Sequence, residues 1–482
     1  MFASAPVAAS IVYRPRRPEN SVLYQAVAQH LPAFLSSADE ADRPVPRFVR
    51  REFEAFLACG IAERGAVRAR CRSCGFDRLI AFSCKSRSGL CASCATRRMV
   101  DVVTHLCEHV IPDVPVRQWV MTVPPPVRYV LAYNSELLTA VIRIFVYAVF
   151  AHLRSVARRE LDLPKGARIE AGAVCVPQRF NSALALSPHL HVLAADGVWV
   201  QREPGVTPTF HALPAPTTGE LATVAWSTCE RTVELLKKRG MWSDADPNDD
   251  RLPQKEPLLA ALAIASITGV LAMGPNAGQR PMRLYGRAAL SKQERLDTAD
   301  KAPANGYGFD LHAGARAAAH DKKARQRLCG YLLRPPLSND RLTRTESGEY
   351  RIAFKRVWDN GAAAIVVSGQ ELLARLALLV PPPRVHTTRY LGVFAPRSVW
   401  RRLIVPESPA TSCCASEPEP DSCEHAHRYR LSWAQALCKV YDLDLGTCPR
   451  CGCRGMQQIA VIRDPRVLRA ILASLQRKQD PP

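Results

Sequence analysis

The sequence has few acidic residues for its content of basic ones. Asp and Glu number 44 against 65 Lys and Arg, which gives a formal net charge of +21 over 482 residues. The excess is spread along the chain rather than confined to one tail. A protein of this charge is expected to bind a polyanion, and nucleic acid is the first expectation. The alternative is a basic soluble protein without such a partner.

The sequence also lacks a long hydrophobic run and a secretory leader. Its longest apolar stretch, Leu258–Met273, has 16 residues and is interrupted by polar residues and a glycine. That length is short for a membrane span and favours a buried helix. Residues 1–6 contain no basic segment leading into an apolar core. We therefore expect a cytoplasmic, nucleoid-associated protein with no membrane partner.

The composition is nevertheless that of a folded protein, because 47% of the residues are hydrophobic. The length predicts two to four domains. There are 17 cysteines. In a reducing compartment these are expected to be metal ligands and free thiols rather than disulfides.

Two Cys-x-x-Cys pairs stand sixteen residues apart: Cys71 and Cys74, then Cys91 and Cys94. This spacing predicts one structural zinc ion held by four thiolates, which leaves no open position for catalysis. Cys59 and Cys84 are additional cysteines nearby. They are either ligands of a second ion or packed thiols, and the second interpretation is favoured for each.

A third pair, Cys448 and Cys451, lies near the C-terminus with Cys453 close by. It is half of a zinc site. Its missing partners could be Cys423, His425 or His427.

Two histidines alternate with hydrophobic residues in the segment Ser187–Leu193. Strand side chains alternate between faces, so His189 and His191 would share one face, close enough to bind one metal ion. Leu190, Val192 and Ala194 would then pack into a core on the other face. The Asp-Gly pair at 196–197 predicts a turn that ends the strand. The alternative is a pair of solvated or hydrogen-bonded histidines.

Tyr331 lies near the end of a predicted basic helix, Ala315–Leu333, which Pro335 and Pro336 terminate. A cation-rich setting binds phosphate, and a tyrosine there can attack a phosphodiester. The alternative is an aromatic residue of the core. The basic residues expected to contact DNA are Arg179, Lys323, Arg327, Arg334 and Arg341.

Together these features resemble the rolling-circle (HUH-class) insertion-sequence transposases of the insertion-sequence-91 and common-region type. The resemblance covers roughly residues 50 to 465 and rests on short phrases in the family's order. The phrases are Phe82-Ser83-Cys84-Lys85, Gln178-Arg179-Phe180, His189-Leu190-His191, Tyr331 to Ser338, Arg389-Tyr390-Leu391-Gly392 and Cys448-Pro449-Arg450-Cys451.

The resemblance implies an α+β fold with a central antiparallel sheet, flanking helices, an N-terminal zinc-binding domain and a small C-terminal domain. We expect a helical and zinc-binding domain at 1–112, a catalytic domain at 113–348 and its extension at 349–405. A linker at 406–430 and a cysteine-knuckle and helix segment at 431–482 would follow. The partner would be single-stranded DNA at the ends of the protein's own mobile element, with host replication involved indirectly and self-association left open.

The resemblance also implies a mechanism. His189 and His191 would hold Mg²⁺ or Mn²⁺ with a third ligand, for which Gln178 is the first choice and Asp196 and His320 are alternatives. Tyr331 would attack the scissile phosphate, and the product would be a 5′-phosphotyrosine with a free 3′-hydroxyl.

The chain departs from the family members that carry two catalytic tyrosines four residues apart. The residue four positions before Tyr331 is Arg327, so the sequence favours the single-tyrosine branch. Tyr390 is a distant candidate for a second nucleophile, although packing is the favoured role. Other functions that fit the sequence are a plasmid replication initiator or relaxase, a zinc-containing DNA-binding protein without activity, and an inactive transposase copy.

Overall fold

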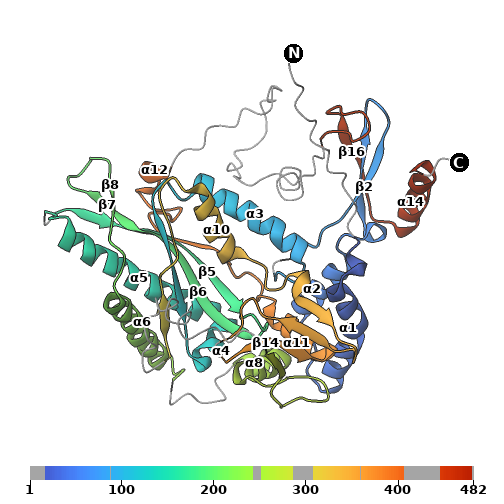
Figure 1. Cartoon of the computed structure of the whole chain (residues 1–482), viewed down its shortest axis with the longest axis horizontal. Coiled ribbons are helices and arrows are strands. Elements are labelled where there is room, and N and C mark those ends of the chain that lie inside the picture. Colours follow the sequence, from blue (N-terminus) through green and yellow to red (C-terminus); the bar gives the residue numbers. More distant parts are fainter. Residues whose placement is uncertain are drawn as a thin grey trace.

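A computed structural model describes residues 17–86, 88–164, 166–242, 251–285, 308–358, 360–405 and 446–479. Helices and antiparallel sheets are mixed along the chain, which confirms the predicted α+β class (Figure 1). The expected linker at 406–430 lies outside the described residues, as do Cys423, His425 and His427.

A six-stranded antiparallel sheet forms the centre of the molecule. Its main path runs β10 (Asp310–His312), β3 (Val116–Thr122), β6 (Leu186–Ala195), β5 (Gly172–Phe180) and β15 (Arg389–Gly392), and β11 (Arg316–Ala317) also pairs with β3. β6 is the central strand of this path, with β3 and β5 on its two sides.

Helices cover both faces of the central sheet. Leu190, Val192 and Ala194 of β6 pack into one core with α5 (Ser135–Glu160) and α6 (Thr218–Lys238), as the alternation in the sequence predicts. Leu193 and Ala195 pack into a second core with α3 (Ala92–His109) and α10 (Lys322–Leu333). The two helices of this second face pack against each other (Figure 1). The side chains of His189 and His191 therefore share a face with α3 and α10.

Among the described residues, α5 is the one helix long and apolar enough to cross a membrane. Its apolar side chains, such as Val141, Phe145 and Val149, are fully buried against the central sheet. This packing is that of a core helix.

A third core lies beside the end of β6 at which Leu186 stands. It joins α1 (Val22–Glu40), α2 (Arg47–Ala58), α8 (Pro257–Thr268) and α11 (Gly369–Leu379) to a four-stranded sheet. That sheet has the order β12 (Leu342–Arg344), β13 (Tyr350–Ala353), β14 (Ala362–Val367) and β9 (Met282–Tyr285). The short helices α4 (Pro125–Tyr133), α7 (Arg251–Lys255) and α12 (Arg401–Ile404) complete the helices of the described central region.

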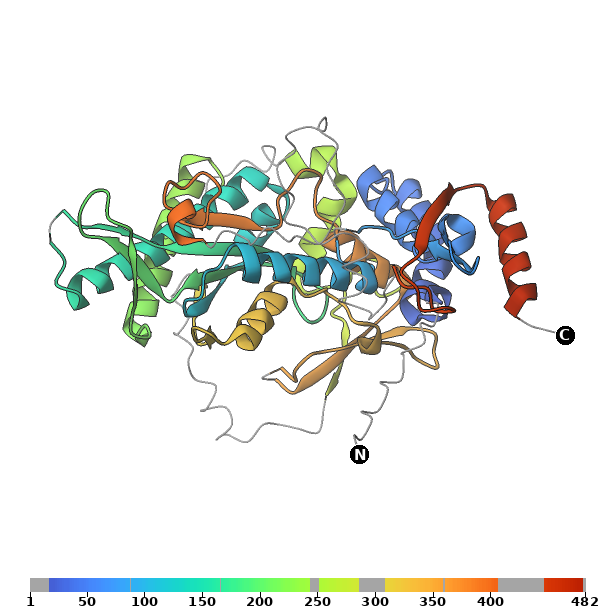
Figure 2. The same ribbon diagram turned by 90° about the horizontal axis from the view of Figure 1, so that it is seen from above.

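The two ends of the chain share one small sheet. Its order is β16 (Met456–Ile462), β1 (Ala66–Cys71) and β2 (Asp77–Ala81), and β16 runs antiparallel to β1. Figure 2 shows the C-terminal strand beside the N-terminal region, with α14 (Pro465–Gln479) at the outer end of the molecule. The C-terminal segment thus completes the N-terminal module.

The Asp-Gly pair ends β6 as predicted, but the next strand does not fold back to pair with it. β7 (Gly197–Gln201) continues into a separate sheet between β4 (Arg168–Glu170) and β8 (Thr209–Ala212). A Cβ at Gly197 would stand 2.2 Å from the carbonyl oxygen of His211. The glycine is therefore needed for the close approach of β8 rather than for a reversal of the chain.

The predicted helix Ala315–Leu333 is shorter in the structure. Arg316 and Ala317 form the strand β11, and the helix α10 begins at Lys322. Asp321 caps it, because its side chain accepts a hydrogen bond from the backbone N–H of Ala324 at 2.8 Å.

We predict that Arg375→Met destabilises the third core. The Arg375 Nε donates to the buried Glu371 carboxylate at 2.8 Å, and burial raises the pKa of Glu371. Removal of the guanidinium leaves a buried acid without a counter-charge, which costs about 3–5 kcal/mol. Urea unfolding followed by tryptophan fluorescence measures the loss. Arg159→Met, at an exposed ion pair, is the control and should leave the free energy of unfolding nearly unchanged; equal effects of the two variants would contradict the prediction.

Candidate active site and metal centres

Two histidines on β6 form the centre of the candidate active site. The rings of His189 and His191 lie 4.8 Å apart between centroids. The Nδ1 of His189 lies 2.7 Å from the carbonyl oxygen of Ser187. A carbonyl can only accept a hydrogen bond, so Nδ1 carries the proton and Nε2 keeps its lone pair.

The second histidine is buried more deeply and is held by Gln118 on β3. The Nδ1 of His191 lies 2.7 Å from the Nε2 of Gln118. A half-turn of this amide exchanges its nitrogen and oxygen, and the oxygen would then accept the Nδ1 proton and leave the Nε2 lone pair of His191 for a metal. In the structure the Nε2 of His191 is buried and has no hydrogen-bond partner. Burial, with the charges of His189 and Arg334, lowers the pKa of His191 to about 2. The imidazole is therefore neutral at physiological pH.

Gln178 on β5 stands directly opposite His189 in the strand register. Its Nε2 donates to the backbone carbonyls of Tyr331 and Leu332, at 3.2 and 2.8 Å. These two acceptors determine the orientation of the amide, and they leave its Oε1 buried without a partner. Gln178 thus holds the end of α10. Its unpaired Oε1 belongs to β5, the strand beside the one that carries the histidines.

Tyr331 on α10 lies beside His191. Its ring centroid is 5.7 Å from that of His191, with the planes at 72°. The residue is 44% exposed, so its side chain reaches solvent while its helix is packed on the sheet. The Arg334 guanidinium lies 4.0 Å from the centre of the Tyr331 ring. The tyrosine is therefore accessible, and its ring contacts a neutral histidine and a cation.

Other cations surround this group. The charges of Arg334 and Arg128 add to burial in lowering the pKa of His189. Burial, followed by the charges of Arg334 and Arg341, lowers the pKa of Lys355 to about 8. The sequence analysis did not identify Gln118, Arg128 or Lys355. No motif marks these residues, because they reach the site only through folding.

The two alternative third ligands lie elsewhere. Asp196 stands five residues beyond His191 on the same chain, about 16 Å along an extended strand. Its carboxylate is paired with Arg117 and Arg316, at 2.8 and 2.7 Å. His320 is exposed and pairs with Asp113. Neither residue is near the histidine pair. Of the three candidate third ligands, Gln178 alone lies beside it.

Two of the five predicted DNA contacts are instead structural. Arg179 donates to the carbonyls of Ala132 and Leu378, and Arg341 donates to those of Ala353, Pro336 and Ser182. Their guanidinium groups satisfy backbone acceptors rather than face a ligand. Lys323 and Arg327 are exposed on α10, and Arg334 is half-buried beside Tyr331.

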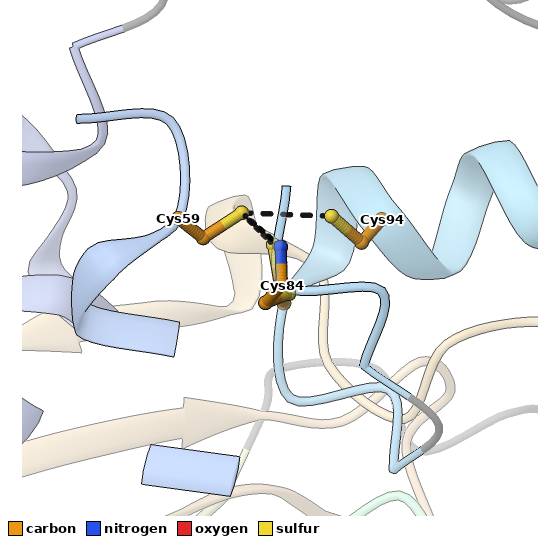
Figure 3. Close-up of side chains that lie close together, drawn as sticks. Cys59, Cys84 and Cys94 are labelled. Atoms are coloured by element: carbon orange, nitrogen blue, oxygen red, sulfur yellow. Dashed lines mark hydrogen bonds between the residues drawn. The ribbon is translucent and has the colours of Figure 1, made fainter. Parts of the chain in front are cut away.

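Cys59 and Cys84 join the knuckle at the start of α3. With Cys91 and Cys94 they form a group whose four sulfurs lie within 4.8 Å of one another. The Cys59 sulfur is 3.7 Å from that of Cys91. It is 3.5 Å from that of Cys94, and it accepts the backbone N–H of Cys84 (Figure 3). Zinc–sulfur bonds of about 2.3 Å in a tetrahedron place sulfurs about 3.8 Å apart. The group therefore fits a structural zinc ion.

The knuckle of Cys71 and Cys74 does not belong to that group. It forms a second group with Cys448 and Cys451, again with all four sulfurs within 4.8 Å. The expectation that Cys71, Cys74, Cys91 and Cys94 share one zinc ion is thus wrong, although each knuckle does enter a cysteine cluster. One signal in the sequence separates the knuckles: Gly75 and Gly452 directly follow Cys74 and Cys451, whereas Ala95 follows Cys94.

The donors beside Tyr331 fit a divalent cation. His191 Nε2 and Gln178 Oε1 are buried polar atoms without partners, and an unpaired buried polar atom costs free energy. A carbonyl oxygen such as that of the Gln178 amide suits Mg²⁺ and Mn²⁺, and imidazole nitrogens bind divalent first-row transition metals.

Comparison with known families gives two matches. Residues 172–401 match the family described as "Putative transposase", and residues 26–123 match the family described as "Transposase zinc-binding domain". The chain belongs to the IS91 family of transposases. The first match contains His189, His191 and Tyr331, and the second contains both N-terminal knuckles. No curated protein and no solved structure matches the chain.

This IS91-family transposase is therefore a DNA-processing enzyme with an N-terminal domain that binds zinc, and DNA is its partner. The resemblance seen in the sequence is confirmed at the level of the family. The basic excess of the composition fits that partner.

We predict that Cys84→Ser lowers the zinc content by one ion per chain. Cys84 approaches Cys59 and the knuckle from the loop after β2, so its loss opens the group of Cys59, Cys84, Cys91 and Cys94. Elemental analysis of the purified protein measures the change. Cys229→Ser, at a buried cysteine of α6, is the control and should leave the zinc content unchanged. An unchanged zinc content in Cys84→Ser would contradict the ligand set.

Proposed function

We propose that this transposase nicks and rejoins single-stranded DNA at the ends of its own mobile element through a 5′-phosphotyrosine at Tyr331. One observation carries the proposal. An exposed tyrosine stands edge-on to a buried histidine whose Nε2 lacks a partner, and cations surround both.

His189, His191 and Gln178 would hold the divalent cation, Mg²⁺ or Mn²⁺. When bound there, the cation polarises the scissile phosphate and orients it. The protein's own contribution is the fixed set of donors. The carbonyl of Ser187 determines the tautomer of His189, and Gln118 holds the ring of His191. The backbone carbonyls of α10 determine the orientation of Gln178.

Tyr331 Oη attacks the phosphorus, and the bond from phosphorus to the 3′-oxygen of the preceding nucleotide breaks. The tyrosine proton passes to solvent, and the departing 3′-oxygen gains a proton. The ester retains the energy of the broken bond, so a 3′-hydroxyl can later attack the phosphotyrosine and rejoin the strand without ATP. The Arg334 guanidinium at the ring of Tyr331 offsets charge on the phosphate during both steps.

The packing of Tyr390, the other candidate nucleophile, favours a single catalytic tyrosine. Tyr390 on β15 packs against the second core and lies edge-on to His105. The residue four positions before Tyr331 is the exposed Arg327. One strand of the element would thus be released and moved in a rolling-circle manner, with host replication at the nucleoid filling the gap.

We predict that Tyr331→Phe abolishes the covalent protein–DNA adduct and leaves DNA binding intact, because the variant loses only the hydroxyl. The assay mixes protein with labelled single-stranded oligonucleotides from both flanks of the gene and Mn²⁺, followed by a denaturing gel. Tyr390→Phe is the matched control and should form the adduct as the wild type does. An adduct of full yield in Tyr331→Phe, or its loss in Tyr390→Phe alone, would exclude Tyr331 as the nucleophile.

We predict that His189→Ala lowers the rate of metal-dependent nicking at least about 100-fold, because loss of a ligand removes several kcal/mol of charge stabilisation. His211→Ala, on the separate sheet of β4, β7 and β8, is the control and should nick at the wild-type rate. Rates are measured on the same oligonucleotides over a titration of Mn²⁺. Unchanged nicking by His189→Ala at every Mn²⁺ concentration would count against the metal site.

A further inference from the structure

Two knuckles from opposite ends of the chain have the same backbone geometry. Each is a Cys-x-x-Cys-Gly sequence, at 71–75 and at 448–452. Gly75 and Gly452 take positive φ values of 69° and 71°, which favour glycine. The N–H of each glycine donates to the carbonyl of the first cysteine, at 3.0 and 2.9 Å. The two turns are thus built alike, and each presents two sulfurs.

The two knuckles face each other across 374 residues of sequence. The sulfurs of Cys74 and Cys448 are 3.6 Å apart, and those of Cys71 and Cys451 are 3.7 Å apart. These separations are far longer than a disulfide bond of about 2.05 Å. They match the edges of a tetrahedron of four thiolates around zinc, which are about 3.8 Å long.

We propose that Cys71, Cys74, Cys448 and Cys451 bind a second zinc ion that fastens the C-terminal segment to the N-terminal sheet. Four protein ligands close the coordination sphere, so the ion is structural. The C-terminal knuckle lies outside both family matches, which end at residues 123 and 401. The site is separate from the nicking chemistry, and it stands or fails independently of Tyr331.

The described packing at this junction is weak without a metal. β16 pairs with β1, but Ile459 and Val461 of β16 are 49% and 53% exposed. In α14, Leu468 is the one fully buried side chain among the residues whose burial is described. Strand pairing with so little buried apolar surface is marginal in water. A structural zinc ion adds folding free energy directly, and here it would hold the two segments together.

Cys453 competes for the fourth ligand position. Its sulfur is 3.4 Å from that of Cys71 and 3.1 Å from that of Cys451. We assign the position to Cys451, because Cys451 occupies the same place in its knuckle as Cys74 does and completes the group of four close sulfurs. The experiment below distinguishes these two cysteines.

The first test counts zinc in the full-length protein by native mass spectrometry and elemental analysis. The wild type should hold two zinc ions per chain. Cys448→Ser and Cys451→Ser should each hold one, while Cys453→Ser should hold two. Cys74→Ser removes a ligand from the N-terminal knuckle and should also hold one zinc ion. One zinc ion in the wild type would overturn the site. Loss of zinc from Cys453→Ser, with two ions in Cys451→Ser, would overturn the assignment of the fourth ligand.

The second test asks whether the ion fastens the two segments. A recognition sequence for a specific protease is inserted between residues 406 and 445, and the full-length protein is cut and passed over a sizing column. The C-terminal fragment should co-elute with the rest of the wild-type chain and of Cys453→Ser. It should separate in Cys448→Ser. Retention of the fragment in Cys448→Ser after loss of one zinc ion would overturn the fastening role.

Discussion

The candidate active site depends on the register of one strand. β6 lies between β3 and β5, and its alternate residues Leu190, Val192 and Ala194 are buried against α5 and α6. A slip of one residue would turn these side chains out of that core and would turn His189 and His191 into it. The burial of the apolar set therefore decides where the imidazoles lie. Pairing with both neighbours then places Gln178 and Gln118 on the same face as the histidines.

Much of this centre could be predicted from the sequence because it is local. An alternation of histidine and hydrophobic residues determines a face within one strand, and the structure has that face as expected. Gln178 is a different case, since it belongs to another strand. Its place opposite His189 depends on the pairing of β5 with β6, and it reached the prediction through the family resemblance rather than through the pattern.

The wrong predictions concern contacts between distant residues, which only the three-dimensional structure determines. Spacing predicts that a Cys-x-x-Cys pair binds zinc, but any two knuckles can complete a tetrahedron. The actual pairing joins Cys71 to Cys451 across most of the chain. Charge has the same ambiguity. Arg179 and Arg341 are predicted from the sequence to contact DNA, yet each donates hydrogen bonds to backbone carbonyls in the interior. A guanidinium carries five donors, so it serves a buried acceptor as readily as a phosphate.

The N-terminal zinc group bears on the active site through α3. Cys91 and Cys94 lie at the start of this 18-residue helix, which is about 27 Å long. Its far end packs against α10, where the Cys107 sulfur is 3.8 Å from that of Cys329. Cys329 lies two residues before Tyr331 on α10. A metal that holds the first turn of α3 therefore also limits how the helix that carries Tyr331 can sit on the sheet. This geometry gives a physical reason for a zinc domain in an enzyme whose zinc has no open position for catalysis.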